Sequence, residues 1–277
     1  MTMFHRFIFI ALSFCLGFCK LSGQKGVEIG TWLGVSNYFG DLNNLYRLNE
    51  PGLAGGLIAR YNLNNRVSPQ ILLNYSRLRA HDSKSSNLFD RRRNLSFFSD
   101  VIELSPSISF NFFPFIHGKA ENSITPHLIT GFSFFYFNPK AEYLGQAYNL
   151  RSLGTEGQSS NQEYGAISAA WLVGLGLKID LNYHYSLNID FNARLAFTDY
   201  LDDVSTSYPN LANLQSTRGP IAVALSDPSI PGSKGEKIGT QGFQRGDSKD
   251  KDMFTTLGVG LLYYFGRLDC PKISNPY

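Results

Sequence analysis

The sequence predicts an all-β fold, an eight-stranded antiparallel transmembrane β-barrel with short turns at one end and long loops at the other. Composition is the first observation: 43% of residues are hydrophobic, 14% aromatic and only 17% charged. The second and third are eight segments of alternating polarity and connections that alternate between short and long. High apolar content with a net charge of +3 excludes a disordered chain and gives no reason to expect a nucleic-acid partner.

Residues 1–23 are predicted to be a cleavable signal peptide. A short basic start precedes an apolar stretch at residues 7–18, and small residues follow at positions 21–23. The apolar stretch is too short for a membrane helix. Cys270 is the one cysteine left after cleavage, so no intramolecular disulfide is expected. Lipidation at Cys15 or Cys19 is disfavoured because a phenylalanine precedes each.

In the first half of the chain, period-2 alternation predicts four strands. In Val27–Phe39, apolar Val, Ile and Leu alternate with Glu, Gly, Trp and Ser, so the two faces of the strand differ. Three further segments alternate with more noise: Leu53–Leu63, Val67–His81 and Leu95–Phe112.

The second half repeats the pattern in Ile124–Phe137, Ala169–Asp180, Leu187–Thr198 and Met253–Phe265. Leu187–Thr198 alternates most cleanly, with Leu, Ile and Phe on one face and Asn, Asp and Arg on the other. The last segment ends on aromatic residues, which is typical of strands recognised for barrel insertion.

Strand length and face composition favour a membrane barrel over the alternative, a soluble lipocalin-like barrel or sandwich. Strands of soluble proteins usually have about 5 or 6 residues, whereas a membrane strand needs about 9 to 11 to cross the hydrocarbon. The less apolar face is rich in Gly, Ser and Asn, which suit the interior of a narrow barrel.

Short and long connections alternate without exception. The short ones are Asn64–Arg66, Phe113–Ser123 and Leu181–His184, and the long ones are Gly40–Gly52, Asp82–Asn94, Asn138–Gly165 and Asp199–Asp252. Outer-membrane barrels have short periplasmic turns and long surface loops. The sequence therefore predicts an outer-membrane barrel over residues 24–266, with both termini periplasmic, and a periplasmic tail over residues 267–277.

Aromatic residues near the strand ends are interpreted as interfacial girdles in contact with lipid. They are Tyr38 and Phe39, Phe97 and Phe98, Phe134 to Phe137, and Tyr263 to Phe265.

Five charged residues are expected on the inward face: Glu28, Arg60, Glu103, Asp190 and Arg194. Unpaired charges would be costly inside a narrow barrel, so these residues should pair with one another. We interpret them as a salt-bridged plug; a gated polar channel is the alternative. Because eight strands leave room only for side chains, no small-molecule substrate is expected to pass.

No catalytic, cofactor or metal site is predicted. The histidines are scattered and none has a Ser and a carboxylate arranged as a triad. Two groups of aspartates, at 199–203 and 247–252, do not match a calcium loop and are interpreted as solvated loop charge. Arg91–Arg93 in a surface loop is either a solvated basic cluster or a contact for anionic lipopolysaccharide of the surrounding outer-membrane lipid.

Three segments carry a family resemblance: Ser36–Leu42, the run Tyr143–Leu150 with Gly154–Gln158, and Thr198–Ser205. They resemble PorG-like outer-membrane proteins of the type IX secretion system, a DUF6089-like family, over about Val27 to Cys270. The first and last also occur in other small barrels of the same bacterial phylum.

The resemblance implies a non-enzymatic barrel that anchors a periplasmic ring, built from a lipoprotein and a partner subunit, and that serves protein secretion and gliding. Contact with the ring is expected through the short turns and the tail, including Arg267 and Cys270. A general surface barrel for adhesion or envelope integrity and a lipid-modifying enzyme are the alternatives.

Overall fold

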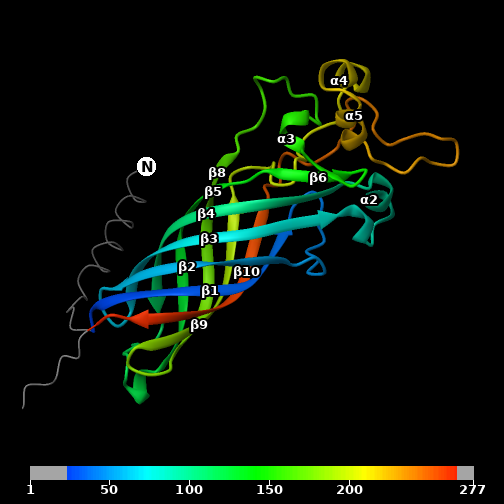
Figure 1. Cartoon of the computed structure of the whole chain (residues 1–277). Helices are drawn as coiled ribbons and strands as arrows, with labels where there is room; N and C mark the ends of the chain where they lie inside the picture. The colour runs from blue at the N-terminus through cyan, green and yellow to red at the C-terminus, as the bar shows by residue number, and fades with distance from the viewer. Residues whose placement is uncertain (1–23, 267–277) are drawn as a thin grey trace, which may run out of the picture.

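The computed structural model describes residues 24–266, which fold into a closed antiparallel barrel with a cap at one end (Figure 1). The predicted signal peptide and the tail with Arg267 and Cys270 lie outside the described residues. Eight strands form the barrel: β1 (Gly26–Phe39), β2 (Gly52–Asn62), β3 (Val67–His81), β4 (Ser96–Asn111), β5 (Ile124–Tyr136), β8 (Ile167–Asp180), β9 (Tyr185–Ala196) and β10 (Met253–Tyr264). The predicted fold class is thus confirmed, and each predicted strand is present with bounds shifted by at most two residues.

Neighbouring barrel strands pair antiparallel in chain order, and β3 pairs with β4. The barrel closes where the first and last strands meet, in a register that sets Glu28 against Tyr264 and Phe39 against Met253. Both ends of the described chain therefore lie together, opposite the helices (Figure 1). Closure leaves no free strand edge among these eight strands, so every barrel strand has two neighbours.

Side chains alternate between the interior and the outer surface as the sequence pattern predicts. On β1, Glu28 is 1% exposed, whereas its neighbour Ile29 is 49% exposed and Leu33 is 71% exposed. On β9, Phe191 is 48% exposed and Arg194 is 1% exposed. A continuous apolar outer face of this kind is stable only against lipid, because contiguous apolar patches of this extent are rare on soluble monomers. The fold is that of eight-stranded outer-membrane barrels.

The connections divide into short turns at the end with the termini and long loops at the other. The turns contain η2 (Ala120–Asn122), and the loops contain η1 (Asp82–Lys84), α2 (Leu88–Arg93), β6 (Pro139–Tyr143), β7 (Gln146–Asn149), α3 (Leu150–Leu153), α4 (Leu211–Arg218) and α5 (Pro220–Ser226).

Among residues 24–266, no helix is both long enough and apolar enough to cross a membrane.

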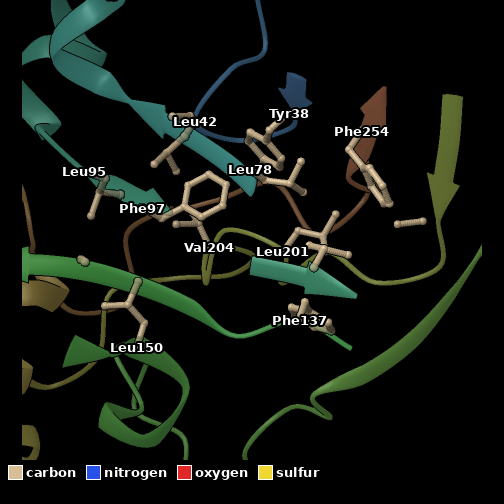
Figure 2. Packing of buried hydrophobic residues seen from close by; sticks show 14 of the residues in the cluster. Tyr38, Leu42, Leu78, Leu95, Phe97, Phe137, Leu150, Leu201, Val204 and Phe254 are labelled. Atoms are coloured by element: carbon tan, nitrogen blue, oxygen red, sulfur yellow. The ribbon is translucent and has the colours of Figure 1, made fainter. Parts of the chain in front are cut away.

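The long loops, residues 40–51, 82–95, 137–166 and 197–252, pack together into one unit that we term the cap. Its β6 and β7 extend the sheet from β4, so the third loop folds over the barrel mouth. The largest apolar cluster of the described chain lies where the cap meets the barrel, and Figure 2 shows side chains from strands and loops converging there. Its members include Leu42, Phe97, Leu150, Leu201 and Phe254.

The girdle interpretation was wrong for part of the aromatic set. Tyr38, Phe97, Phe135 and Phe137 are at most 1% exposed and belong to the apolar cluster under the cap. Parity along each strand explains this, because Phe97 and Phe135 have the same parity as inward-facing residues of their strands. Other members of the set do face outward: Phe134 is 53% exposed and Phe265 is 60% exposed.

Candidate functional site

The barrel interior near the periplasmic end contains a buried charge cluster centred on Glu28. Arg60 Nη1 lies 3.1 Å from Glu28 Oε2, and both side chains are 1% exposed. Asn62 donates a second hydrogen bond to this carboxylate at 2.5 Å. His117 also reaches it, with Nε2 3.2 Å from Glu28 Oε1 and Nδ1 2.9 Å from Asp180.

The side chain of His117 closes the periplasmic end of the barrel. It belongs to the turn at 112–123, yet its side chain is 1% exposed, because the turn bends into the barrel. The imidazole stacks on Tyr264 with ring centroids 4.2 Å apart. The periplasmic mouth is therefore closed by a turn residue that three contacts hold in place.

A second cluster lies toward the cap, around Glu103 and Arg194. Arg194 Nε is 3.1 Å from Glu103 Oε1, and both side chains are 1% exposed. Arg194 also donates to Thr256 at 2.6 Å. Glu103 accepts from Ser133 at 3.0 Å and from Asn74 at 3.3 Å. A buried ion pair needs such additional hydrogen bonds to offset its desolvation.

Asp190 lies between the clusters and faces His127, whose Nε2 is 3.1 Å from Asp190 Oδ1. The five charges expected inside are all inward, but only four of them pair with each other, as Glu28 with Arg60 and Glu103 with Arg194. The sequence reasoning missed His117, His127, Lys178 and Asp180 as members of the interior.

Lys178 is 1% exposed, and its ammonium donates to Ser109 at 3.0 Å and to Asn111 at 2.8 Å. Alternation within Ala169–Asp180 already placed Lys178 and Asp180 on the less apolar face, so a signal for these two existed. No such signal existed for His117, because the residues of a turn do not alternate between two faces.

Side chains fill the interior. A cavity beside Trp32, Ile58, Leu72 and Arg194 has a volume of only about 10 Å³. This is about the volume of one water molecule, and Trp32, Ile58 and Leu72 belong to a buried apolar cluster inside the barrel.

The cap is held by two buried arginines that join all four long loops. Arg93 of α2 donates to Asp82 at 2.7 and 2.9 Å and to the carbonyl oxygen of Asp41 at 2.9 Å. Arg245 donates to Glu156 at 3.2 Å and to the Asp203 carbonyl oxygen at 2.6 Å. Burial alone would lower the pKa of Arg93, but the hydrogen bonds and charge of Asp82 outweigh it and raise that pKa.

Arg93 thus corrects the interpretation of Arg91–Arg93 as a uniformly solvated cluster, since its side chain is 7% exposed. The aspartate interpretation is corrected as well. Asp202, Asp203 and Asp252 are each 1% exposed, so they are structural groups of the cap rather than solvated loop charge.

Asp202 and Asp252 share one hydroxyl. Tyr38 Oη lies 2.6 Å from Asp202 and 2.7 Å from Asp252. A hydroxyl carries one proton, so one carboxyl must itself be protonated to supply the second hydrogen bond. Burial, together with the repulsion between the two carboxyls, raises the pKa of Asp202 well above its ordinary value.

Neighbouring carboxyls behave in the same way. Burial raises the pKa of Asp203 to about 6 although Arg245 lowers it, and burial raises the pKa of Asp199 to about 7. The cap therefore holds several carboxyl groups that titrate near neutral pH.

Two hollows lie in the cap. A groove of about 670 Å³ runs between loops 40–51 and 82–95 and residues 244–253, lined by Asp41, Tyr46 and Phe89 among others. A second hollow of about 440 Å³ is lined by apolar groups such as Leu42 and Leu150 together with polar ones such as Asp202. No group of three His, Cys, Asp or Glu residues in the described part of the chain is arranged to hold a metal ion.

The comparisons with known proteins bear on the same architecture. The model of a family described as a domain of unknown function, DUF6089, matches residues 5–221. The chain belongs to this family. No curated protein matches.

Among the solved structures that resemble the chain are a surface protein, an outer-membrane protein and a β-barrel domain. Neisserial surface protein A is 9% identical, with a TM-score of 0.44, and the match covers 88% of this chain and all of that one. The outer-membrane protein OprG from Pseudomonas aeruginosa is 12% identical, with a TM-score of 0.41, and covers 88% and 98%. The N-terminal β-barrel domain of Pseudomonas aeruginosa OprF is 12% identical, with a TM-score of 0.37, and covers 88% and 100%.

Proposed function

We propose that this protein is a non-enzymatic outer-membrane barrel that anchors the periplasmic ring of a type IX secretion system, and in gliding species also supports motility. The sealed interior is the observation that carries the proposal. The interior of the described barrel holds two buried ion pairs and an apolar cluster, beside a cavity of only about 10 Å³, and the cap covers its other end. A barrel filled in this way is suited to hold other components at the membrane rather than to pass solutes.

The secretion role rests on the family resemblance, and the structure adds where the resembling segments lie. They meet in the cap: Tyr38 contacts Asp202, Thr155 donates to Asp203, and Glu156 accepts from the Ser205 amide at 2.9 Å. These segments are far apart in sequence, yet they form one packed unit. We infer that the resemblance reflects a shared cap fold rather than a collection of loop sequences.

Contact with the ring lipoprotein and its partner subunit would occur at the opposite end. There the turn at 112–123 presents exposed Lys119 and Glu121, and Arg66 lies exposed in the neighbouring turn. The described chain ends at Gly266 on the same side, and the predicted tail with Arg267 and Cys270 follows it in the sequence. This surface is polar at its tips and apolar at its rim, where Phe113 is 59% exposed.

The experiment is deletion of the gene followed by assays of cargo secretion and of ring co-purification from gently solubilised outer membranes. We expect secretion to stop and the tagged wild-type barrel to recover both ring subunits. A tagged Lys119→Glu/Glu121→Lys variant should recover less ring, whereas Lys249→Glu in the cap should recover the wild-type amount. Normal secretion in the deletion strain would rule out the proposal.

A second candidate, a surface barrel for adhesion, draws on the exposed apolar side chains of the cap. Leu144 is 87% exposed and Phe243 is 65% exposed. This function predicts that Leu144→Ser/Phe243→Ser weakens attachment of cells to a surface and leaves ring recovery unchanged. A lipid-modifying enzyme would instead alter lipid profiles on overproduction.

A further inference from the structure

Outward-facing charge on the strands of the described chain is confined to one place. Three neighbouring strands provide all of this charge: β3 with Arg77, Arg79 and His81, β4 with Asp100, and β6 with Lys140 and Glu142. The other charged strand residues point into the barrel. One sector of the outer rim is thus charged, whereas the rest of the outward-facing strand surface of the described chain carries no charge.

Strand register arranges this sector in rows. Arg79 is opposite Phe98, which is opposite Lys140 on the next strand, and one row below Arg77 is opposite Asp100. The next row down joins Tyr75, Ile102 and Tyr136, and the row beneath it joins Leu73, Leu104 and Phe134.

These rows locate the cations relative to the membrane. Tyrosines mark the interface between hydrocarbon and headgroups, so the Tyr75 row is the aromatic belt. Successive outward residues are about 7 Å apart along a strand. A tilt of about 40° makes each row roughly 5 Å of depth. Arg77 and Arg79 therefore lie about 5 to 10 Å above the belt, at the level of lipid headgroups.

The side chains are held in this position. Arg77 lies over the Phe98 ring, 4.7 Å from its centroid, and is 3.7 Å from Asp100. Arg79 donates to the Pro51 carbonyl oxygen at 2.6 Å, which leaves its other donors free for a ligand. Lys140 is half-buried and has no hydrogen-bond or ion-pair partner among residues 24–266. Arg79 and Lys140 lie on either side of β4, about 10 Å apart.

We propose that this rim is a binding site for the phosphate groups of a lipopolysaccharide, with Arg79 and Lys140 as the two principal contacts and Arg77 as a third. Arginine pairs with phosphate through several parallel hydrogen bonds. The apolar rows directly beneath would contact the acyl chains of the same molecule. Continuity of the cations with this apolar band favours a lipid over a soluble anion.

The site rests on the outer-membrane location in the proposed function but not on the secretion role. The test uses the purified full barrel in nonionic detergent, with bisphosphorylated lipid A, dephosphorylated lipid A and inorganic phosphate as probes. Binding is measured by microscale thermophoresis, and heat-dependent migration on gels verifies that each variant is folded.

Each removed cation should weaken binding of bisphosphorylated lipid A about fivefold, so Arg79→Gln/Lys140→Gln should raise the dissociation constant about 25-fold. The matched control is Lys249→Gln/Lys251→Gln, which removes the same charge from exposed residues just before β10, a strand that pairs with β1 and β9 and not with β3 or β4. It should bind as the wild type does. Asp100→Asn should bind more tightly because it removes the one anion within these rows.

Unchanged binding in the folded Arg79→Gln/Lys140→Gln variant would overturn the proposal, as would an equal loss of binding in the Lys249→Gln/Lys251→Gln control. Equal binding of dephosphorylated lipid A would also overturn it, and so would competition by inorganic phosphate at the affinity of lipid A. Normal secretion in a strain with Arg79→Gln/Lys140→Gln separates this site from the secretion role.

Discussion

Replacing Arg194 with methionine tests whether the barrel depends on its paired interior charges. The change removes the cation 3.1 Å from Glu103 and leaves that carboxylate 1% exposed without a counter-ion. Loss of one partner of a buried pair costs about 3 to 5 kcal/mol. Glu103 keeps hydrogen bonds from Ser133 and Asn74, so we expect the lower end, about 3 kcal/mol.

The assay is reversible unfolding of the purified barrel by guanidinium in lipid vesicles, monitored by tryptophan fluorescence. Arg77→Met is the matched control, because Arg77 also pairs with a carboxylate, Asp100, but at 3.7 Å with side chains 45% and 36% exposed. An exposed pair contributes about 0 to 1 kcal/mol. The double change Arg194→Met/Glu103→Gln should recover much of the loss because no buried charge then remains unpaired.

The reasoning is refuted if Arg194→Met unfolds at the same denaturant concentration as the wild type, or if Arg77→Met loses as much. A double variant less stable than Arg194→Met alone would show that packing, rather than the unpaired carboxylate, sets the cost.

Three further predictions concern pH, closure and the membrane. Burial raises the pKa of Asp203 to about 6, so between about pH 4 and 6 the folded cap keeps a proton that the unfolded chain releases. The stability of the cap is therefore lost as pH rises through this range. Limited proteolysis of the cap should be slower in mild acid than at neutral pH, and Asp203→Asn should reduce this difference in rate. A Cβ at Gly34 would lie 2.1 Å from the Leu257 carbonyl oxygen across the closing strand pair, so Gly34→Leu should lower stability by about 1 to 3 kcal/mol and reduce the folded fraction on gels. Trp171 is 51% exposed and Trp32 is 9% exposed; in brominated lipid, a Trp32→Phe variant should lose most of its fluorescence and a Trp171→Phe variant little.

Much of the barrel could be predicted from the sequence, because side-chain direction in a strand has period 2 and needs no partner to be recognised. Leu187–Thr198 determines by itself that Phe191 faces lipid and Arg194 faces inward. Alternation also predicts correctly that Phe97 faces inward, since it is an even number of residues from inward-facing Glu103. The girdle interpretation failed there because aromatic residues near strand ends can serve either lipid or a buried core.

Which charges meet could not be predicted. Glu28 and Arg60 are opposite each other only because of the β1–β2 register. Asp190 on β9 meets His127 on β5 over Gly176 of the intervening strand β8, and this too depends on strand register. Tertiary structure also decided the cap. Its loops have no periodicity, so nothing local distinguished buried Asp202 from exposed Asp250.

The sequence by itself determined the strands, their lipid faces and the end at which each connection lies, since these follow from local alternation and connection length. Only the tertiary structure decided that His117 closes one mouth, that four loops cover the other, and that the outward charges of three strands gather in one sector. Those features depend on strand register and on contacts between distant segments, which are set only when the barrel closes.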